Sequence, residues 1–161
     1  MSIFVKVTPA GIPRSLQAKQ ISIIYAGLLV VFAVTQLFTF DEFLEYFPSL
    51  GLPFGAGFVY SLADIIVASE VFAIPFLLRM SLSPAFRWLS MLLGWFVPLF
   101  WFFISIWIIF TNPAIESVAF IGGLAELPPG WWAVFTSLAL GLMATWSSWG
   151  LWPGSLKFAK K

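Results

Sequence analysis

Two carboxyl side chains interrupt an otherwise apolar stretch of the sequence and are its strongest chemical signal. Asp64 and Glu70 both lie in the apolar run from about Phe58 to Leu78. An Asp at the centre of a bilayer costs about 2.5–3.5 kcal/mol on insertion scales, so such residues usually face the protein interior and serve a function. We predict that both are buried functional carboxylates. The alternative is that each only hydrogen-bonds a neighbouring helix and serves packing.

The spacing of the two carboxylates limits how they can cooperate. Six residues along an ideal helix separate Asp64 and Glu70 by roughly 120° around the axis and ~9 Å along it. They cannot face one small site unless the helix deforms. Pro75 provides a cause of deformation, because a proline leaves the carbonyl of Val71 without its helical partner.

Four polar side chains are candidate supports for the carboxylates. Gln36 lies towards the end of the first apolar run, and Tyr25 lies in its first half, at a depth nearer Glu70. Tyr60 precedes the first carboxylate by one helical turn. Arg79 follows the second by nine residues, about 13 Å along an ideal helix, so a direct pair within that helix is excluded.

The residue inventory excludes much catalytic chemistry. The chain has no Cys and no His, so thiolate nucleophiles, Cys/His metal sites, His-ligated haem and a Ser–His–Asp triad are all absent. We predict no metal site, and an enzyme acting alone is the least favoured class of function. The net charge of +1 provides no basic surface for nucleic acid.

A regular series of aromatic residues marks the third apolar run. Phe96, Phe100, Phe103 and Trp107 follow a 4-3-4 spacing and so share one helical face. One interpretation is a flat-walled pocket for a quinone-like ring. The other, which we favour, is lipid-facing bulk, because aromatic residues also lie on the remaining faces of this helix.

The elements that position these residues are four long apolar runs. They cover about 21–40, 58–78, 88–110 and 131–152, each near the ~20 residues that cross a bilayer as a helix. The chain is 61% hydrophobic and only 9% charged, against about 25% charged in soluble domains. We predict an all-α integral membrane protein, one domain over residues 1–161, folded as an up-down-up-down four-helix bundle.

Basic residues separate completely from acidic loops. All eight basic residues lie before the first run, between the second and third, or after the fourth: Lys6, Arg14, Lys19, Arg79, Arg87, Lys157, Lys160 and Lys161. The positive-inside rule then places both termini and the Arg79–Arg87 loop in the cytoplasm. The segment Phe43–Gly57 is too apolar for a free loop, so we expect it to fold back onto the outer end of the bundle.

Two further features predict how the helices pack. Pro98 leaves the carbonyl of Gly94 without its helical partner, which we interpret as a kink. Ser137, Gly141 and Thr145 form a small-residue face at four-residue spacing, which lets another helix approach closely.

Several short stretches form a recognisable set of motifs. They read Thr35-Gln36-Leu37-Phe38, Phe43-Leu44, Leu50-Gly51-Leu52-Pro53, and Glu70 followed by Phe76-Leu77-Leu78-Arg79. Over about residues 22–110 the chain thereby resembles the DoxX-like family of small four-span bacterial membrane proteins, including its MauE-type redox-associated members. The resemblance implies a bacterial-type plasma membrane and a role beside redox enzymes or a quinone pool.

These observations lead to one functional expectation and two alternatives. We expect a DoxX-like accessory or redox-associated subunit that binds a hydrophobic partner, such as a quinone, in a bundle lined by Glu70, Asp64 and aromatic residues of the third run. Its partners would be the lipid bilayer and another membrane or redox protein. The first alternative is a small proton-coupled transporter with the two carboxylates as protonation sites. The second is a purely structural membrane subunit.

Overall fold

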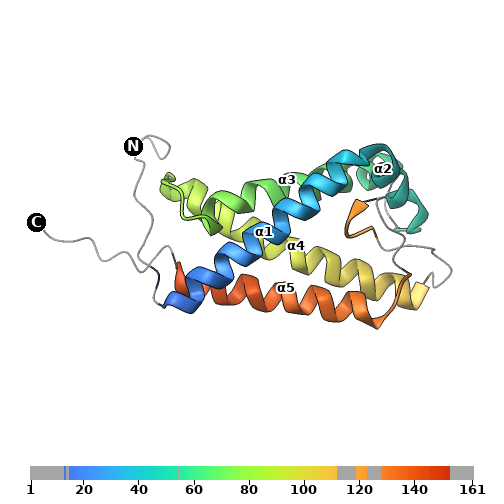
Figure 1. The fold of residues 1–161 in the computed structure, drawn as a ribbon. Helices are drawn as coiled ribbons and strands as arrows, with labels where there is room; N and C mark the ends of the chain where they lie inside the picture. The colour runs from blue at the N-terminus through green and yellow to red at the C-terminus, as the bar shows by residue number, and fades with distance from the viewer. Residues whose placement is uncertain (1–12, 14, 54, 112–118, 123–127, 153–161) are drawn as a thin grey trace, which may run out of the picture.

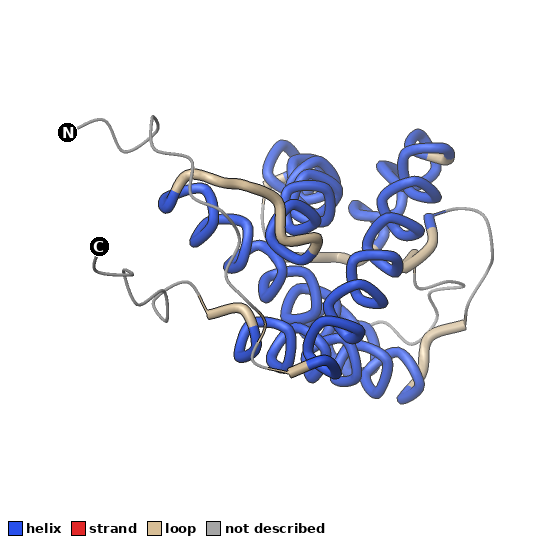
Figure 2. Tube along the Cα trace, turned by 60° about the vertical axis from the view of Figure 1, so that its left-hand side comes forward, coloured by secondary structure: helices blue, strands red, loops and turns tan. Residues whose placement is uncertain are grey.

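The computed structural model describes residues 13, 15–53, 55–111, 119–122 and 128–152. Its elements are the α-helices α1 (Leu16–Phe38), α2 (Phe40–Ser49), α3 (Ala56–Leu77), α4 (Pro84–Thr111) and α5 (Trp131–Gly150). Figure 2 shows that helices make up nearly all of the part described. The four predicted apolar runs are therefore confirmed as helices. The predicted basic tails at Lys6, Arg14 and Lys157–Lys161 lie outside the described residues.

Three of the helices are long and apolar enough to cross a membrane. These are Leu16–Phe38, Gly57–Leu77 and Pro84–Thr111, with mean hydropathies of 2.2, 1.7 and 2.2. α5 is not among them, although it spans 20 residues without a charge. Its Trp, Ser, Thr and Gly residues lower its mean hydropathy, so its predicted crossing of the membrane stays a prediction.

The four long helices pack side by side. α3 packs against α4, α4 against α5, and α1 against both α3 and α5. In Figure 1, α1 crosses the other three helices obliquely. The start of α1 meets the end of α5 so closely that a Cβ on Gly150 would collide with Ala18. At the same end, the Ser22 hydroxyl donates to the Leu77 carbonyl at 2.6 Å.

The segment after α1 forms the helix α2. α2 begins directly after α1 and presents Phe43 and Phe47, with Leu50 just beyond its end, to the other helices, and all three residues are fully buried. The Trp107 indole of α4 donates to the Leu50 carbonyl at 3.0 Å. The predicted folding back is thus confirmed, and the 4-3 spacing of its apolar residues explains the helical form. Figure 1 places α2 at the end of the molecule opposite the start of α1.

Two prolines interrupt the long helices, and side chains from neighbouring helices satisfy the polar backbone groups around them. Around Pro75 in α3, the Ser90 hydroxyl of α4 accepts from the Phe76 amide at 3.1 Å and donates to the Phe72 carbonyl. A proline breaks the local helical hydrogen-bond ladder, and buried polar groups require other partners. Ser90 therefore stabilises the break in α3 from the adjacent helix.

The small-residue face of α5 only partly meets its neighbour. Ser137 is buried, and a Cβ on Gly141 would meet the Cβ of Pro98 at 3.9 Å, an ordinary contact between α5 and α4. Thr145 is exposed, so the predicted face turns outwards towards the end of α5. Its hydroxyl bonds back to the Gly141 carbonyl at 2.7 Å.

Candidate functional site

Glu70 is fully buried between helices and lies in a polar cluster. The Gln36 amide of α1 donates to Glu70 Oε1 at 3.2 Å and to the carbonyl of Phe120 at 3.0 Å. Glu70 and Gln36 each have an exposed fraction of 0%. The predicted burial of Glu70 is confirmed, and its bond to Gln36 is the interhelical contact that the packing alternative expects. The Gln36 amide group therefore connects α1 with α3, through Glu70, and with the 119–122 segment, through Phe120.

Three polar atoms in this cluster have no hydrogen-bond partner within the described part of the chain. They are Glu70 Oε2, Gln36 Oε1 and Trp101 Nε1. The Trp101 indole lies within reach of the Glu70 carboxyl without adopting hydrogen-bond geometry. Buried polar atoms almost always have a protein or water partner. The cluster therefore has unused capacity for a water molecule or for a polar atom of a ligand.

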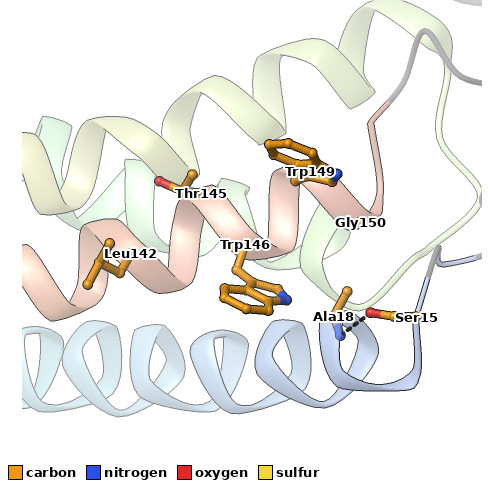
Figure 3. A pocket seen from close by; sticks show the side chains of 7 residues that line it. All are labelled: Ser15, Ala18, Leu142, Thr145, Trp146, Trp149 and Gly150. Carbon is orange, nitrogen blue, oxygen red and sulfur yellow. Dashed lines mark hydrogen bonds between the residues drawn. The ribbon is translucent and has the colours of Figure 1, made fainter.

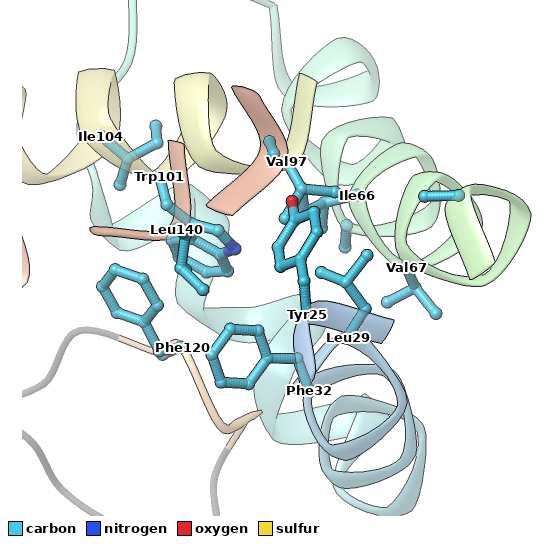
Figure 4. Close-up of a cluster of buried hydrophobic side chains, with 14 of the residues drawn as sticks. Tyr25, Leu29, Phe32, Ile66, Val67, Val97, Trp101, Ile104, Phe120 and Leu140 are labelled. Atoms are coloured by element: carbon cyan, nitrogen blue, oxygen red, sulfur yellow. The ribbon is translucent and has the colours of Figure 1, made fainter. Parts of the chain in front are cut away.

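Aromatic rings surround the polar cluster on the Trp101 side. The Phe120 ring stacks on the Trp101 indole with centroids 4.6 Å apart and an interplanar angle of 22°. Phe32 meets Phe120 edge-on at 6.2 Å, and Phe43 lies 6.5 Å from Trp101. Figure 4 shows Phe120, Phe32 and Leu140 gathered around Trp101. The stacked pair forms a flat-sided aromatic wall beside the Glu70 carboxyl.

Sequence reasoning did not select Trp101 or Phe120 as site residues. Trp101 lies outside the 4-3-4 aromatic series, yet it is the largest fully buried side chain among the described residues. A usable signal is the 4-3 spacing of Val97, Trp101 and Ile104, all of which are buried in α4. Phe120 follows the third apolar run and has no periodicity that would mark it.

Tyr25 belongs to the same interior and satisfies the carbonyl left free by Pro98. Its hydroxyl donates to the Gly94 carbonyl at 2.6 Å and is fully buried. Pro98 cannot donate the helical hydrogen bond that this carbonyl would otherwise accept. Tyr25 is also close enough to Glu70 for an electrostatic interaction. Its predicted position near the Glu70 level is confirmed, and it connects α1 with α4.

The predicted aromatic series does not form one wall. Phe100 packs against Phe96 at 5.8 Å and against Phe47 of α2 at 6.1 Å. Phe103 is 64% exposed, and Trp107 instead holds the end of α2 through its indole. The 4-3-4 face is thus divided between α2 and the molecular surface, because α2 covers only part of it.

Asp64 is not buried, which corrects the prediction. It lies on the exposed face of α3 together with Tyr60, which is 43% exposed. The reason is the helical rotation: α3 buries Ala63, Ile66 and Glu70, and a residue 120° from Glu70 leaves that stripe. Arg79 follows the end of α3 with a φ of 60°. The structure therefore gathers Glu70, Gln36 and Tyr25 and separates Asp64 and Tyr60 from them.

A cavity lies away from the polar cluster. A cavity of ≈ 500 Å³ opens between the start of α1 and the end of α5, lined by Ser15, Ala18, Leu142, Thr145, Trp146, Trp149 and Gly150. Figure 3 shows Trp146 projecting from α5 towards α1 at its centre. None of the lining residues has an ionisable side chain, so this cavity offers apolar surface rather than acid–base chemistry.

Burial raises the pKa of the Tyr46 phenol in α2 above its ordinary value. Among the described residues no group of three or more Asp, Glu, His or Cys side chains is placed to hold a metal ion.

Comparison of the chain with protein-family models, with curated proteins and with solved structures finds no match.

Proposed function

We propose that the chain is an integral membrane protein in which α1, α3, α4 and α5 cross the bilayer as an up-down-up-down four-helix bundle. Three helices have the required length and hydropathy, and α5 is uncharged and packs against α1 and α4. Large apolar side chains are exposed along the long helices, among them Ile24, Val34, Leu92 and Phe135. Such a surface is suited to lipid rather than water. The distribution of basic residues favours cytoplasmic termini. The resemblance to the DoxX-like family favours a bacterial-type plasma membrane.

Within this membrane protein, we propose that the Glu70 cluster binds the polar head of a hydrophobic partner such as a quinone. The chain would then act as a DoxX-like accessory subunit beside a redox enzyme. The observation that carries the proposal is the set of unsatisfied polar atoms on Glu70, Gln36 and Trp101, next to a stacked aromatic pair. A quinone offers both matching features: carbonyl oxygens that accept hydrogen bonds and a flat ring that stacks.

The chemistry of the cluster defines how such a head would bind. A quinone carbonyl accepts a hydrogen bond from the Trp101 indole, the free donor of the cluster. Its ring takes the place of the Phe120 ring on the indole face. Glu70 Oε2 and Gln36 Oε1 remain as acceptors for the hydroxyl groups of the reduced, quinol form.

A titration with decylubiquinone tests this function. The purified protein in detergent micelles is titrated, and quenching of tryptophan fluorescence reports binding. We expect saturable quenching that is weakened roughly tenfold in Trp101→Phe, the loss of one hydrogen bond of about 1.4 kcal/mol. In a parallel titration with the reduced form, decylubiquinol, Glu70→Gln should weaken binding by a similar factor. Glu45→Gln, at an exposed carboxylate of α2, is the matched control. Quenching that never saturates, or that is equal in all four proteins, would contradict quinone binding.

The proton-coupled transporter gains less support from the geometry. That alternative used Asp64 and Glu70 as two protonation sites of one path, and these residues lie on different faces of α3. A purely structural role would instead require water molecules on the three unsatisfied polar atoms of the cluster.

A further inference from the structure

Asp64 stands on an exposed face of α3 near the middle of that helix. It is the ninth of the 22 residues of α3, which is one of the three helices suited to crossing a membrane. Within the described part of the chain it makes no hydrogen bond or ion pair, whereas Glu70 bonds Gln36. If α3 crosses the bilayer as proposed above, this carboxyl faces acyl chains at a depth where water is absent. Such a placement is costly unless another group covers it.

The residues that flank Asp64 leave room for a covering helix. Gly57, Ser61, Asp64 and Ala68 are all exposed and follow a 4-3-4 spacing, so they form one seam along α3. A Cβ placed on Gly57 would meet no described atom within 4 Å. Along this seam Asp64 thus has the small residues Ser61 and Ala68 as its neighbours, which permits another helix to approach closely.

We propose that this seam of α3 docks a transmembrane helix of a different protein, one that carries a Lys or Arg at the depth of Asp64. Opposite charges attract strongly where water is excluded, so a cation on the partner would compensate the carboxylate. The Tyr60 hydroxyl, one turn away on the same face, adds a second polar group for that cation.

A second copy of this chain fits the seam less well. In a symmetric pair of parallel α3 helices, the two Asp64 carboxyls would meet at one depth and repel each other when ionised. The chain also has no cation of its own to offer there. All eight of its basic residues lie outside the apolar runs, and none lies between positions 51 and 78. The charge pattern therefore selects a different chain.

A peptide-association experiment tests this docking surface. The chain has no Cys, so a single Ser81→Cys substitution in the exposed α3–α4 connection accepts one fluorescent donor. The full chain is placed in phosphatidylcholine vesicles with an acceptor-labelled poly-leucine helix of about 20 residues, carrying either Lys or Leu at its centre. Energy transfer measures association of the peptide with the chain.

We expect the Lys peptide to associate roughly five- to thirtyfold more tightly than the Leu peptide, the range of one interhelical polar contact in model peptides. Asp64→Leu should abolish that preference, and Asp64→Asn should reduce it. Glu45→Gln should keep it, as a matched carboxylate outside the seam. Equal association of the two peptides, or an unchanged preference in Asp64→Leu, would overturn the proposal.

Two further outcomes separate this inference from the function proposed above. Self-association of the labelled chain that disappears in Asp64→Leu would show that a second copy occupies the seam, and would overturn the heterologous partner. Chain that alkaline carbonate extracts from the vesicles would refute membrane insertion, and this inference with it. Quinone titration reads only the Glu70 cluster, so its failure leaves the seam unaffected.

Discussion

Asp64 and Glu70 lie six residues apart on one helix, but they differ in burial and in hydrogen-bond partners. Glu70 is fully buried, bonded to Gln36 and bordered by Trp101, whereas Asp64 is exposed on a face of small residues. The sequence context of the two is similar, since both interrupt the same apolar run. Their neighbours in space make the difference: one carboxyl has its partners within the chain, and the other has to find them outside it.

The contrast extends beyond the carboxylates to the two sides of α3. On the Glu70 side, helices α1 and α4 supply hydroxyl and amide groups to polar atoms of the interior. On the Asp64 side, the Ser61 hydroxyl only bonds back to the Gly57 carbonyl of its own helix. The first side has the features of a site within the protein, and the second has those of a contact surface. Paired substitutions on the two sides test this division.

The largest expected difference concerns the aromatic wall of the Glu70 side. Trp101→Ala should destabilise the protein by about 3–5 kcal/mol, because it removes a fully buried ring and leaves a cavity. Trp149→Ala, at a side chain that is 69% exposed, should change stability by less than about 0.5 kcal/mol. Unfolding in detergent, followed by circular dichroism during an SDS titration, measures both. Similar losses in the two variants would remove Trp101 from the core.

A smaller difference is expected at the break in α3. Ser90→Ala leaves the Phe76 amide and the Phe72 carbonyl without their side-chain partner next to Pro75, at a cost of about 1–3 kcal/mol. Ser61→Ala removes only a hydroxyl bonded within its own exposed turn and should be nearly silent. The same SDS titration gives both values. A silent Ser90→Ala would mean that α3 tolerates the break without help from α4.

The two tyrosines provide a third matched pair. Tyr25→Phe removes the hydrogen bond to the Gly94 carbonyl and should cost about 0.5–1.5 kcal/mol. Tyr60→Phe, on the exposed side, should have no measurable effect on the isolated protein. A cost for Tyr60→Phe equal to that of Tyr25→Phe would show that the Asp64 side is already covered within the chain.

Much of this division follows from sequence, and the part that does not has a physical cause. The long helices follow from apolar length, and the burial of Glu70 from the cost of a carboxyl in lipid. The spacing of Asp64 and Glu70 already predicts that only one of them faces a small site. Which of the two carboxyls is buried depends on the side of α3 that α1 and α4 cover. This is decided by tertiary packing and not by the sequence of α3 alone. The contact of Gln36 with Glu70 depends likewise on the oblique crossing of α1 over α3.

The aromatic residues also show what a local sequence pattern cannot predict. The 4-3-4 series from Phe96 to Trp107 predicts a shared face of α4, but it cannot reveal that α2 covers only part of that face. α2 itself was detectable from the 4-3 spacing of Phe43, Phe47 and Leu50. Phe120 reaches Trp101 from a segment distant in sequence, so no local pattern predicts the stacked pair.

The smallest expected effect is at Asp64 itself, and it is the most informative. In the isolated protein in detergent, Asp64→Leu should change stability by no more than about 0.5 kcal/mol, because the side chain is exposed and micelles leave water near it. The same substitution at Glu70 removes the acceptor of the Gln36 amide from a closed interior, so it should produce the larger change, whichever its sign.

In vesicles Asp64→Leu should stabilise the chain, since it removes a carboxyl from acyl chains and no partner is present. SDS titration in micelles and urea-resistant vesicle integration measure the two cases. A marked loss of stability in micelles would show that Asp64 has a partner within its own chain, and the two sides of α3 would no longer differ in kind.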